Sequence, residues 1–154
     1  MTVQQQRHSV AADSLYDRDI IAWANEQARL LRAGHLNRID IEHIAEEIED
    51  VGKSEQRELA SRMAVLLAYL LKWQLQPQRR GRSWQRTIRD QRNGIARRLR
   101  RTPSLAVSLK DSDWWADAWQ DAVAMAASET GLSDLPDDCP WETADIIDHG
   151  WLPG

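Results

Sequence analysis

Phenylalanine is absent from this sequence, cysteine occurs once, and no long apolar run is present. Because Cys139 is the lone cysteine, no disulfide can form within the chain, and the cysteine content gives no sign of an oxidising compartment. The most apolar run, Met63 to Leu71, has nine residues, whereas a helix that spans a membrane needs about 20. Residues 1–14 are mostly polar and lack the apolar stretch of a secretory signal. We therefore expect a cytoplasmic protein with no membrane association.

Tryptophan takes the place of phenylalanine, with eight residues among 154. A chain of this length is the size of one domain. Apolar residues recur at helical spacing along most of it, and no segment has a convincing strand pattern. We predict an all-α fold: a flexible N-terminal tail over residues 1–13, then a single up-and-down helical-bundle domain over residues 14–154 with a short C-terminal helical appendage.

Capping residues and helix stops place the predicted helices at 14–33, 40–76, 83–101, 103–110, 113–130 and 141–148. Ser14 and Ser83 are suitable N-caps, and Gly34 and Gly131 are suitable C-terminal stops. In the second helix the apolar stripe changes phase at Gly52, which predicts a kink or a short break there.

Apolar stripes on the first two helices are expected to face the core. The first stripe consists of Ile20, Trp23, Ala24, Ala28 and Leu31. The second stripe, before Gly52, consists of Ile41, Ile44, Ala45, Ile48 and Val51.

Three segments resemble the bacterial Domain of Unknown Function 29 family. They are the run from Lys72 to Arg92, the acidic stretch from Ala45 to Asp50, and the ending from Asp138 to Trp141. The resemblance extends from about Leu15 to the C-terminus, and Gly81 departs from it where a small polar residue is expected. It implies an all-helical bundle in a family without an established biochemical role, and it adds no site residues.

The net charge of −4 conceals blocks of different sign. Residues 1–71 carry 8 basic and 12 acidic side chains. Residues 72–101 carry 11 basic side chains against Asp90 alone, and residues 111–154 carry 11 acidic side chains and no lysine or arginine. A partner for the basic block is therefore anionic, whether it lies within the chain or outside it.

The basic block predicts an arginine ridge, composed of Arg79, Arg80, Arg82, Arg86, Arg89, Arg97 and Arg100, mostly on the helix face opposite Trp84. The planar guanidinium fork suits phosphate, and Trp73 and Trp84 in the same block are able to stack on bases. The competing interpretation is that acidic segments of the chain cover the ridge through ion pairs, each exposed pair contributing about 0–1 kcal/mol. An acidic protein surface is a third kind of anionic partner.

An acidic helix face composed of Glu42, His43, Glu46, Glu47 and Asp50 is the candidate for a metal site. Bundles that hold two metals use pairs of Glu-x-x-His motifs that point inward. Here Asp40 and His43 give a single related pair, on the side away from the predicted core. We interpret the face as solvated and predict no metal and no cofactor. No histidine falls in a known catalytic arrangement, so we name no catalytic residue.

These observations favour a non-catalytic protein-interaction or self-association domain. Its partner would be a second copy of the chain or another, unidentified protein. The alternative is a nucleic-acid-binding module that uses the arginine-rich third helix. The pI of about 5.6 argues against that alternative, because nucleic-acid-binding domains often have a pI above about 9.

Overall fold

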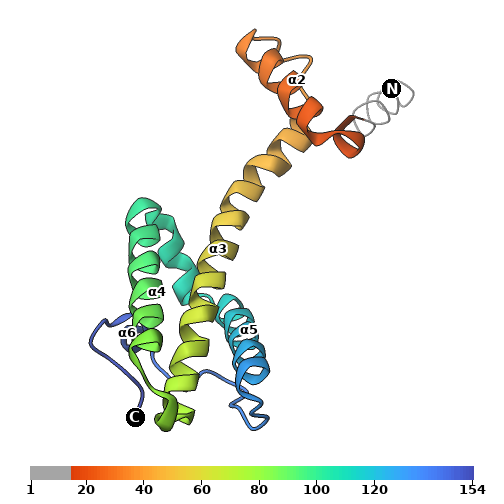
Figure 1. The fold of residues 1–154 in the computed structure, drawn as a ribbon. Coiled ribbons are helices and arrows are strands. Elements are labelled where there is room, and N and C mark those ends of the chain that lie inside the picture. The colour runs from red at the N-terminus through yellow and green to blue at the C-terminus, as the bar shows by residue number, and fades with distance from the viewer. Residues whose placement is uncertain (1–14) are drawn as a thin grey trace. The chain divides into compact units, whose positions relative to one another are not determined.

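The computed structural model describes residues 15–154, which form helices and connecting loops, with no strand in that range (Figure 1). A helical turn at 15–18 comes first. The elements that follow are α2 (Ile20–Arg32), α3 (Ile41–Leu75), the 3₁₀ helix η1 (Pro77–Arg79), α4 (Arg82–Arg101), the 3₁₀ helix η2 (Pro103–Lys110), α5 (Ser112–Thr130) and α6 (Thr143–Ile147). The all-α fold class is confirmed.

Internal contacts divide the chain into a first unit that ends at Gly52 and a second unit that begins at Lys53. The up-and-down arrangement and the single domain over residues 14–154 stay predictions. The predicted tail over residues 1–13 and the cap Ser14 lie outside the described residues. No helix of the described part of the chain is long and apolar enough to cross a membrane.

Helix α2 is shorter than predicted because a second capping residue restarts it. The Asp19 carboxylate accepts a hydrogen bond from the backbone N–H of Ala22 at 3.0 Å, so Asp19 is the N-cap. At the other end Gly34 adopts a left-handed φ of 74°. The backbone N–H groups of Gly34 and His35 donate to Leu31 and Leu30, which is the Schellman motif. The predicted stop at Gly34 is confirmed.

Of the kink or short break predicted at Gly52, the break is wrong, because α3 continues through Gly52 as one helix. The kink stays a prediction. Glycine retains its backbone donor and acceptor, and in a helix it costs only about 1 kcal/mol relative to alanine. The apolar stripe changes phase at Gly52 because the two units divide there, and each half of α3 packs within its own unit.

The two apolar stripes predicted for the first unit are mostly wrong. On α3, Ile41, Ile48 and Val51 are 66%, 67% and 66% exposed. On α2 the buried apolar residues are Trp23 and Leu30, and the predicted Ile20 and Leu31 are exposed. The described part of this unit therefore has little apolar core, and polar contacts hold its helices together.

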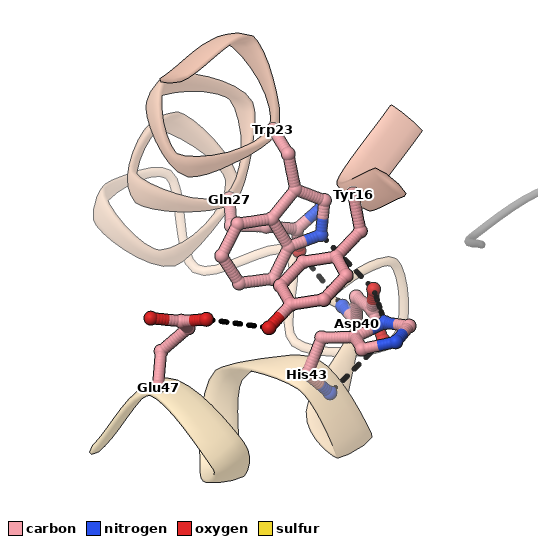
Figure 2. A network of polar contacts seen from close by, with 6 residues as sticks. All are labelled: Tyr16, Trp23, Gln27, Asp40, His43 and Glu47. Carbon is pink, nitrogen blue, oxygen red and sulfur yellow. Dashed lines mark hydrogen bonds and ion pairs between the residues drawn. The ribbon is translucent and has the colours of Figure 1, made fainter. Parts of the chain in front are cut away.

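Asp40 is the centre of these polar contacts, which Figure 2 shows at close range. Its Oδ2 lies 3.0 Å from Nε1 of Trp23 and 2.7 Å from Nδ1 of His43. Partial burial raises the pKa of the Asp40 carboxyl, but the hydrogen bonds from His43 and Trp23 outweigh it, so the pKa lies below its ordinary value. An ionised carboxylate only accepts hydrogen bonds, so both ring nitrogens donate to it.

Three further contacts bring the helical turn at 15–18 and α2 against the start of α3. The ring of Tyr16 stacks on that of His43 with centroids 3.9 Å apart, and its hydroxyl donates to Glu47 (Figure 2). The Glu47 carboxylate thereby raises the pKa of Tyr16 to about 12. Oε1 of Gln27 accepts from the backbone N–H of Asp40 at 2.7 Å. His43 and Glu47, predicted to lie on a solvated face, are therefore packed against these elements.

In the second unit the later half of α3 lies between α4 and α5 (Figure 1). Leu59, Met63, Leu66 and Leu70 of this half are fully buried. Ala118, Ala122 and Ala126 of α5 are buried as well, and small side chains let helices approach closely. Indoles attach the C-terminal segment, since Nε1 of Trp119 donates to the carbonyl of Pro136 at 3.1 Å and its ring meets Trp141 edge to face.

Candidate anion-binding surface

Helix α4 has one apolar face and one basic face. Ile88 and Ile95 are buried in the core of the second unit. The helix begins one residue before Ser83, with Gly81 as N-cap and no side-chain capping bond, so Ser83 is not the cap that was predicted. The α4 members of the arginine ridge are all exposed: Arg82, Arg86, Arg89, Arg97 and Arg100.

The exposed arginines have few partners within the chain. Among residues 15–154, the ion pairs include Arg89 with its neighbour Asp90, at 3.7 Å with both side chains more than half exposed. No ion pair or side-chain hydrogen bond in the same range involves the other four ridge arginines of α4, or Arg79 on η1.

Arg80 differs from the rest of the ridge because its side chain makes contacts within the folded chain. Its Nε donates to the carbonyl of Trp73 at 2.6 Å, and its guanidinium carbon lies 5.1 Å from the centre of the Trp73 ring. Trp73 is itself buried, and Trp84 packs edge to face on Tyr69. The two indoles that were predicted to stack on bases are therefore committed to packing.

Neutralisation by carboxylates occurs beside the ridge. Arg98 contacts Glu55 and Glu58 of α3, each at 3.2 Å. Lys72 contacts Glu129 of α5 at 2.6 Å. The acidic segments thus pair with basic residues that face α3 and α5, and the basic face of α4 keeps its charge exposed.

A surface hollow of about 540 Å³ lies between the first half of α4 and the segment 149–152. Its lining includes the ridge residues Arg82, Arg86 and Arg89, and also Arg92 and His149. Leu152 adds exposed apolar surface, the buried Ile88 lies at the base of the lining, and no carboxylate belongs to it. Arg97 and Arg100 lie further along α4 and do not line the hollow. The structure thus brings together three of the seven predicted residues.

Arg92 is the buried member of this group, with 3% of its surface exposed. Its Nε donates to the carbonyl of Ile146 at 2.8 Å, which ties α4 to α6. Its Nη2 is buried and has no hydrogen-bond partner among the described residues. Burial lowers the pKa of Arg92, and the negative charge of Asp148 opposes that effect. Among residues 15–154 this buried cation has no direct carboxylate partner.

Sequence reasoning missed Arg92 and His149. A signal for Arg92 exists, because its position continues the stripe of Trp84, Ile88, Ile95 and Leu99 on the buried face of α4. His149 has no such local signal. It reaches α4 through the fold, where its Nε2 lies 2.8 Å from Oδ1 of Asn93.

Two other kinds of site were considered in the sequence, a metal site and a reactive cysteine. Within residues 15–154, no group of three or more His, Cys, Asp or Glu side chains is arranged to hold a metal ion. Cys139 is half-buried, and burial raises the pKa of its thiol, which keeps the reactive thiolate scarce.

Comparison with known proteins identifies the family and no activity. No curated protein and no solved structure matches the chain. One family model, described as "Domain of unknown function DUF29", matches residues 15–152, which is nearly the whole chain and includes α4 and the hollow beside it. The chain therefore belongs to the DUF29 family.

Proposed function

We propose that this protein is a non-catalytic interaction domain that self-associates through two faces of opposite charge. The basic face is the set of exposed arginines on α4. The acidic face is formed by Asp113, Asp117 and Asp121, which are spaced four residues apart and so share one side of α5. All three aspartates are exposed. Lys53 and Arg57 line a hollow beside two of them, yet no ion pair within the described residues joins them to an aspartate.

The observation that carries this proposal is how few partners of opposite sign the two faces have within residues 15–154: the exposed arginines make one ion pair, between Arg89 and its neighbour Asp90, and the three aspartates make none. A two-fold dimer satisfies both at once, because α4 of one copy meets α5 of the second and the reverse contact follows by symmetry. Val107 in η2, the connection between these helices, is 71% exposed and would add apolar area. Charge complementarity fixes the orientation and speeds the encounter more than it adds affinity.

Sedimentation velocity of matched charge variants tests the proposal. The wild type is expected to dimerise at low salt and dissociate at high salt, because exposed ion pairs are screened. Arg97→Glu/Arg100→Glu and Asp117→Arg/Asp121→Arg should each be monomeric, and a mixture of the two should form a heterodimer because both contacts are restored. Arg32→Glu/Arg38→Glu in the first unit makes the same charge change on exposed residues and should dimerise like the wild type. A wild type that is monomeric at low salt, or a mixture that stays monomeric, overturns the proposal.

Nucleic-acid binding is the second candidate, and the exposure of unpaired arginines along α4 favours it. Binding to phosphates would weaken linearly with the logarithm of salt concentration, with a slope set by the number of phosphates contacted. Retention of a labelled oligonucleotide should disappear in Arg86→Glu/Arg89→Glu. Unchanged retention in that variant rejects the ridge as a nucleic-acid surface.

A cytoplasmic location is part of the same proposal. It rests on the lone cysteine, Cys139, whose thiol would stay reduced in that compartment. Fractionation of cells that express the tagged full chain would check it, and recovery with the membrane or secreted fraction would contradict it.

A further inference from the structure

The hollow beside α4 gathers cations that the fold does not otherwise use. Arg82, Arg86 and Arg89 are spaced four and three residues apart on α4, so they share one side of the helix and are exposed to solvent, and His149 approaches from the C-terminal segment. Like charges held in one concave site repel one another, and that repulsion is relieved when an anion binds between them. Asp90 contacts Arg89 from outside the lining, with both side chains more than half exposed, so water screens the pair.

Arg92 shows that the site is built into the fold. A guanidinium that is 97% removed from solvent has lost its hydration, and its one hydrogen bond within the described chain is from Nε to Ile146. The buried Nη2 lacks an acceptor, and an unsatisfied buried donor costs about 1–3 kcal/mol or more. Asp148 is close enough to act on Arg92 through its charge, but its Oδ1 accepts from the backbone N–H of Gly150 at 2.9 Å. Arg92 also lines the hollow, so its buried charge lies beside the space that an oxyanion would occupy.

We propose that this hollow binds the phosphate group of a small phosphorylated molecule. Several guanidinium groups around one point match the oxygens of a phosphate monoester, which accept charge-assisted and often bidentate hydrogen bonds. The volume of about 540 Å³ exceeds the needs of a phosphate ion and falls within the range of about 300–1,000 Å³ for small-molecule sites. Leu152, which is 37% exposed, provides apolar surface for the part of the molecule that carries the phosphate. This inference does not depend on self-association.

Isothermal titration of the full chain with phenyl phosphate, inorganic phosphate and inorganic sulfate tests the inference. Phenyl phosphate is expected to bind with one site per chain and more tightly than either inorganic ion. Arg86→Ala/Arg89→Ala should weaken it about a hundredfold or more, because it removes two donors of charge-assisted hydrogen bonds. Arg97→Ala/Arg100→Ala is the matched control, since it removes two exposed arginines of the same helix outside the hollow. It should bind phenyl phosphate like the wild type, even where it loses self-association.

The variant Arg92→Lys tests whether Arg92 contributes to phosphate binding. It keeps the positive charge and removes the planar guanidinium group. Its circular dichroism should match the wild type, and its affinity for phenyl phosphate should fall. If it does not fold, Arg86→Ala/Arg89→Ala and its control still decide the outcome. Absence of phenyl phosphate binding to the wild type overturns the inference, as does an equal loss of affinity in the hollow variant and its control. A different result would point to nucleic acid: phenyl phosphate does not bind, but a single-stranded oligonucleotide does, and both arginine pairs contribute equally to its affinity. In that case α4 binds the phosphate backbone of a polymer instead of a small molecule.

Discussion

The indole Nε1 of Trp23 donates a hydrogen bond to Oδ2 of Asp40 at 3.0 Å, which connects the first turn of α2 to the residue before α3. Trp23→Phe keeps an aromatic ring and removes this donor. We expect it to destabilise the packing of α2 by about 2 kcal/mol, because the lost hydrogen bond ends on a charged group. Hydrogen exchange of the α2 amides should accelerate accordingly. Trp114→Phe, which removes an indole bond to Gln56 in the second unit, should leave α2 exchange unchanged.

Acid should loosen the first unit through Asp40. Since the hydrogen bonds from His43 and Trp23 hold its pKa below the ordinary value, folding favours the carboxylate. The resulting stabilisation is complete above the pKa of the unfolded chain and is lost as the pH falls through the lowered pKa of the folded state. The amide spectrum of α2, followed from neutral to acid pH, should show this loss.

The variant Asp40→Asn isolates that effect. It should start from a less stable first unit and lose no further stability from this position as the pH falls, because the amide does not titrate. Glu26 also has a lowered pKa, owing to its hydrogen bond from Arg29, so both proteins are best compared in a Glu26→Gln background. An identical acid response with and without Asp40 would show that another group controls the loosening.

Two glycines with equally open surroundings should respond oppositely to alanine. Neither Gly52 nor Gly131 has an atom within 4 Å of the place where a Cβ would stand. Gly52 lies inside α3, so Gly52→Ala should stabilise the protein by about 1 kcal/mol through helix propensity. Gly131 has a φ of 74°, so Gly131→Ala should destabilise it by about 1–2 kcal/mol. Midpoints of denaturant unfolding measure both, and a shift of the same sign for both would contradict the backbone explanation.

Local sequence signals were sufficient for most of the helices. Gly34 and Gly131 predicted helix ends because a left-handed φ is needed where each helix stops. The exposed arginines of α4 followed from helical periodicity. Each of these features is decided by residues within a few positions of one another.

The misses involve residues that are far apart in the sequence. On the early part of α3, hydrophobicity alone predicts that Ile41 and Ile48 are buried, yet Asp40 and His43 bind Trp23 and Tyr16 and turn the polar side inward. The candidate site likewise needs the segment 149–152 beside α4, which no local pattern indicates. An arginine at a core-facing position, as at Arg92, is the kind of sequence signal that would have drawn attention to the site.

Lys72 is a buried cation, and Glu129 offsets the cost of burying its charge. Its side chain is 8% exposed, and Nζ lies 2.6 Å from Oε2 of Glu129 and 3.9 Å from the centre of the Tyr69 ring. Glu129→Ala would leave the ammonium with aromatic faces and little water. Breaking a fully buried pair costs about 3–5 kcal/mol, and because Glu129 is 45% exposed we expect about 2 kcal/mol here.

Replacing the cation instead should be better tolerated. Lys72→Met keeps the aliphatic stem against Tyr69 and leaves Glu129, which water can solvate, so it should cost less than Glu129→Ala. The double variant should be about as stable as Lys72→Met alone, because with the ammonium gone the carboxylate has no buried charge to neutralise. Denaturant unfolding of the four proteins completes this cycle. If Lys72→Met proves the more damaging single change, the ion pair stabilises the second unit in its own right, and the carboxylate does more than compensate for a buried charge.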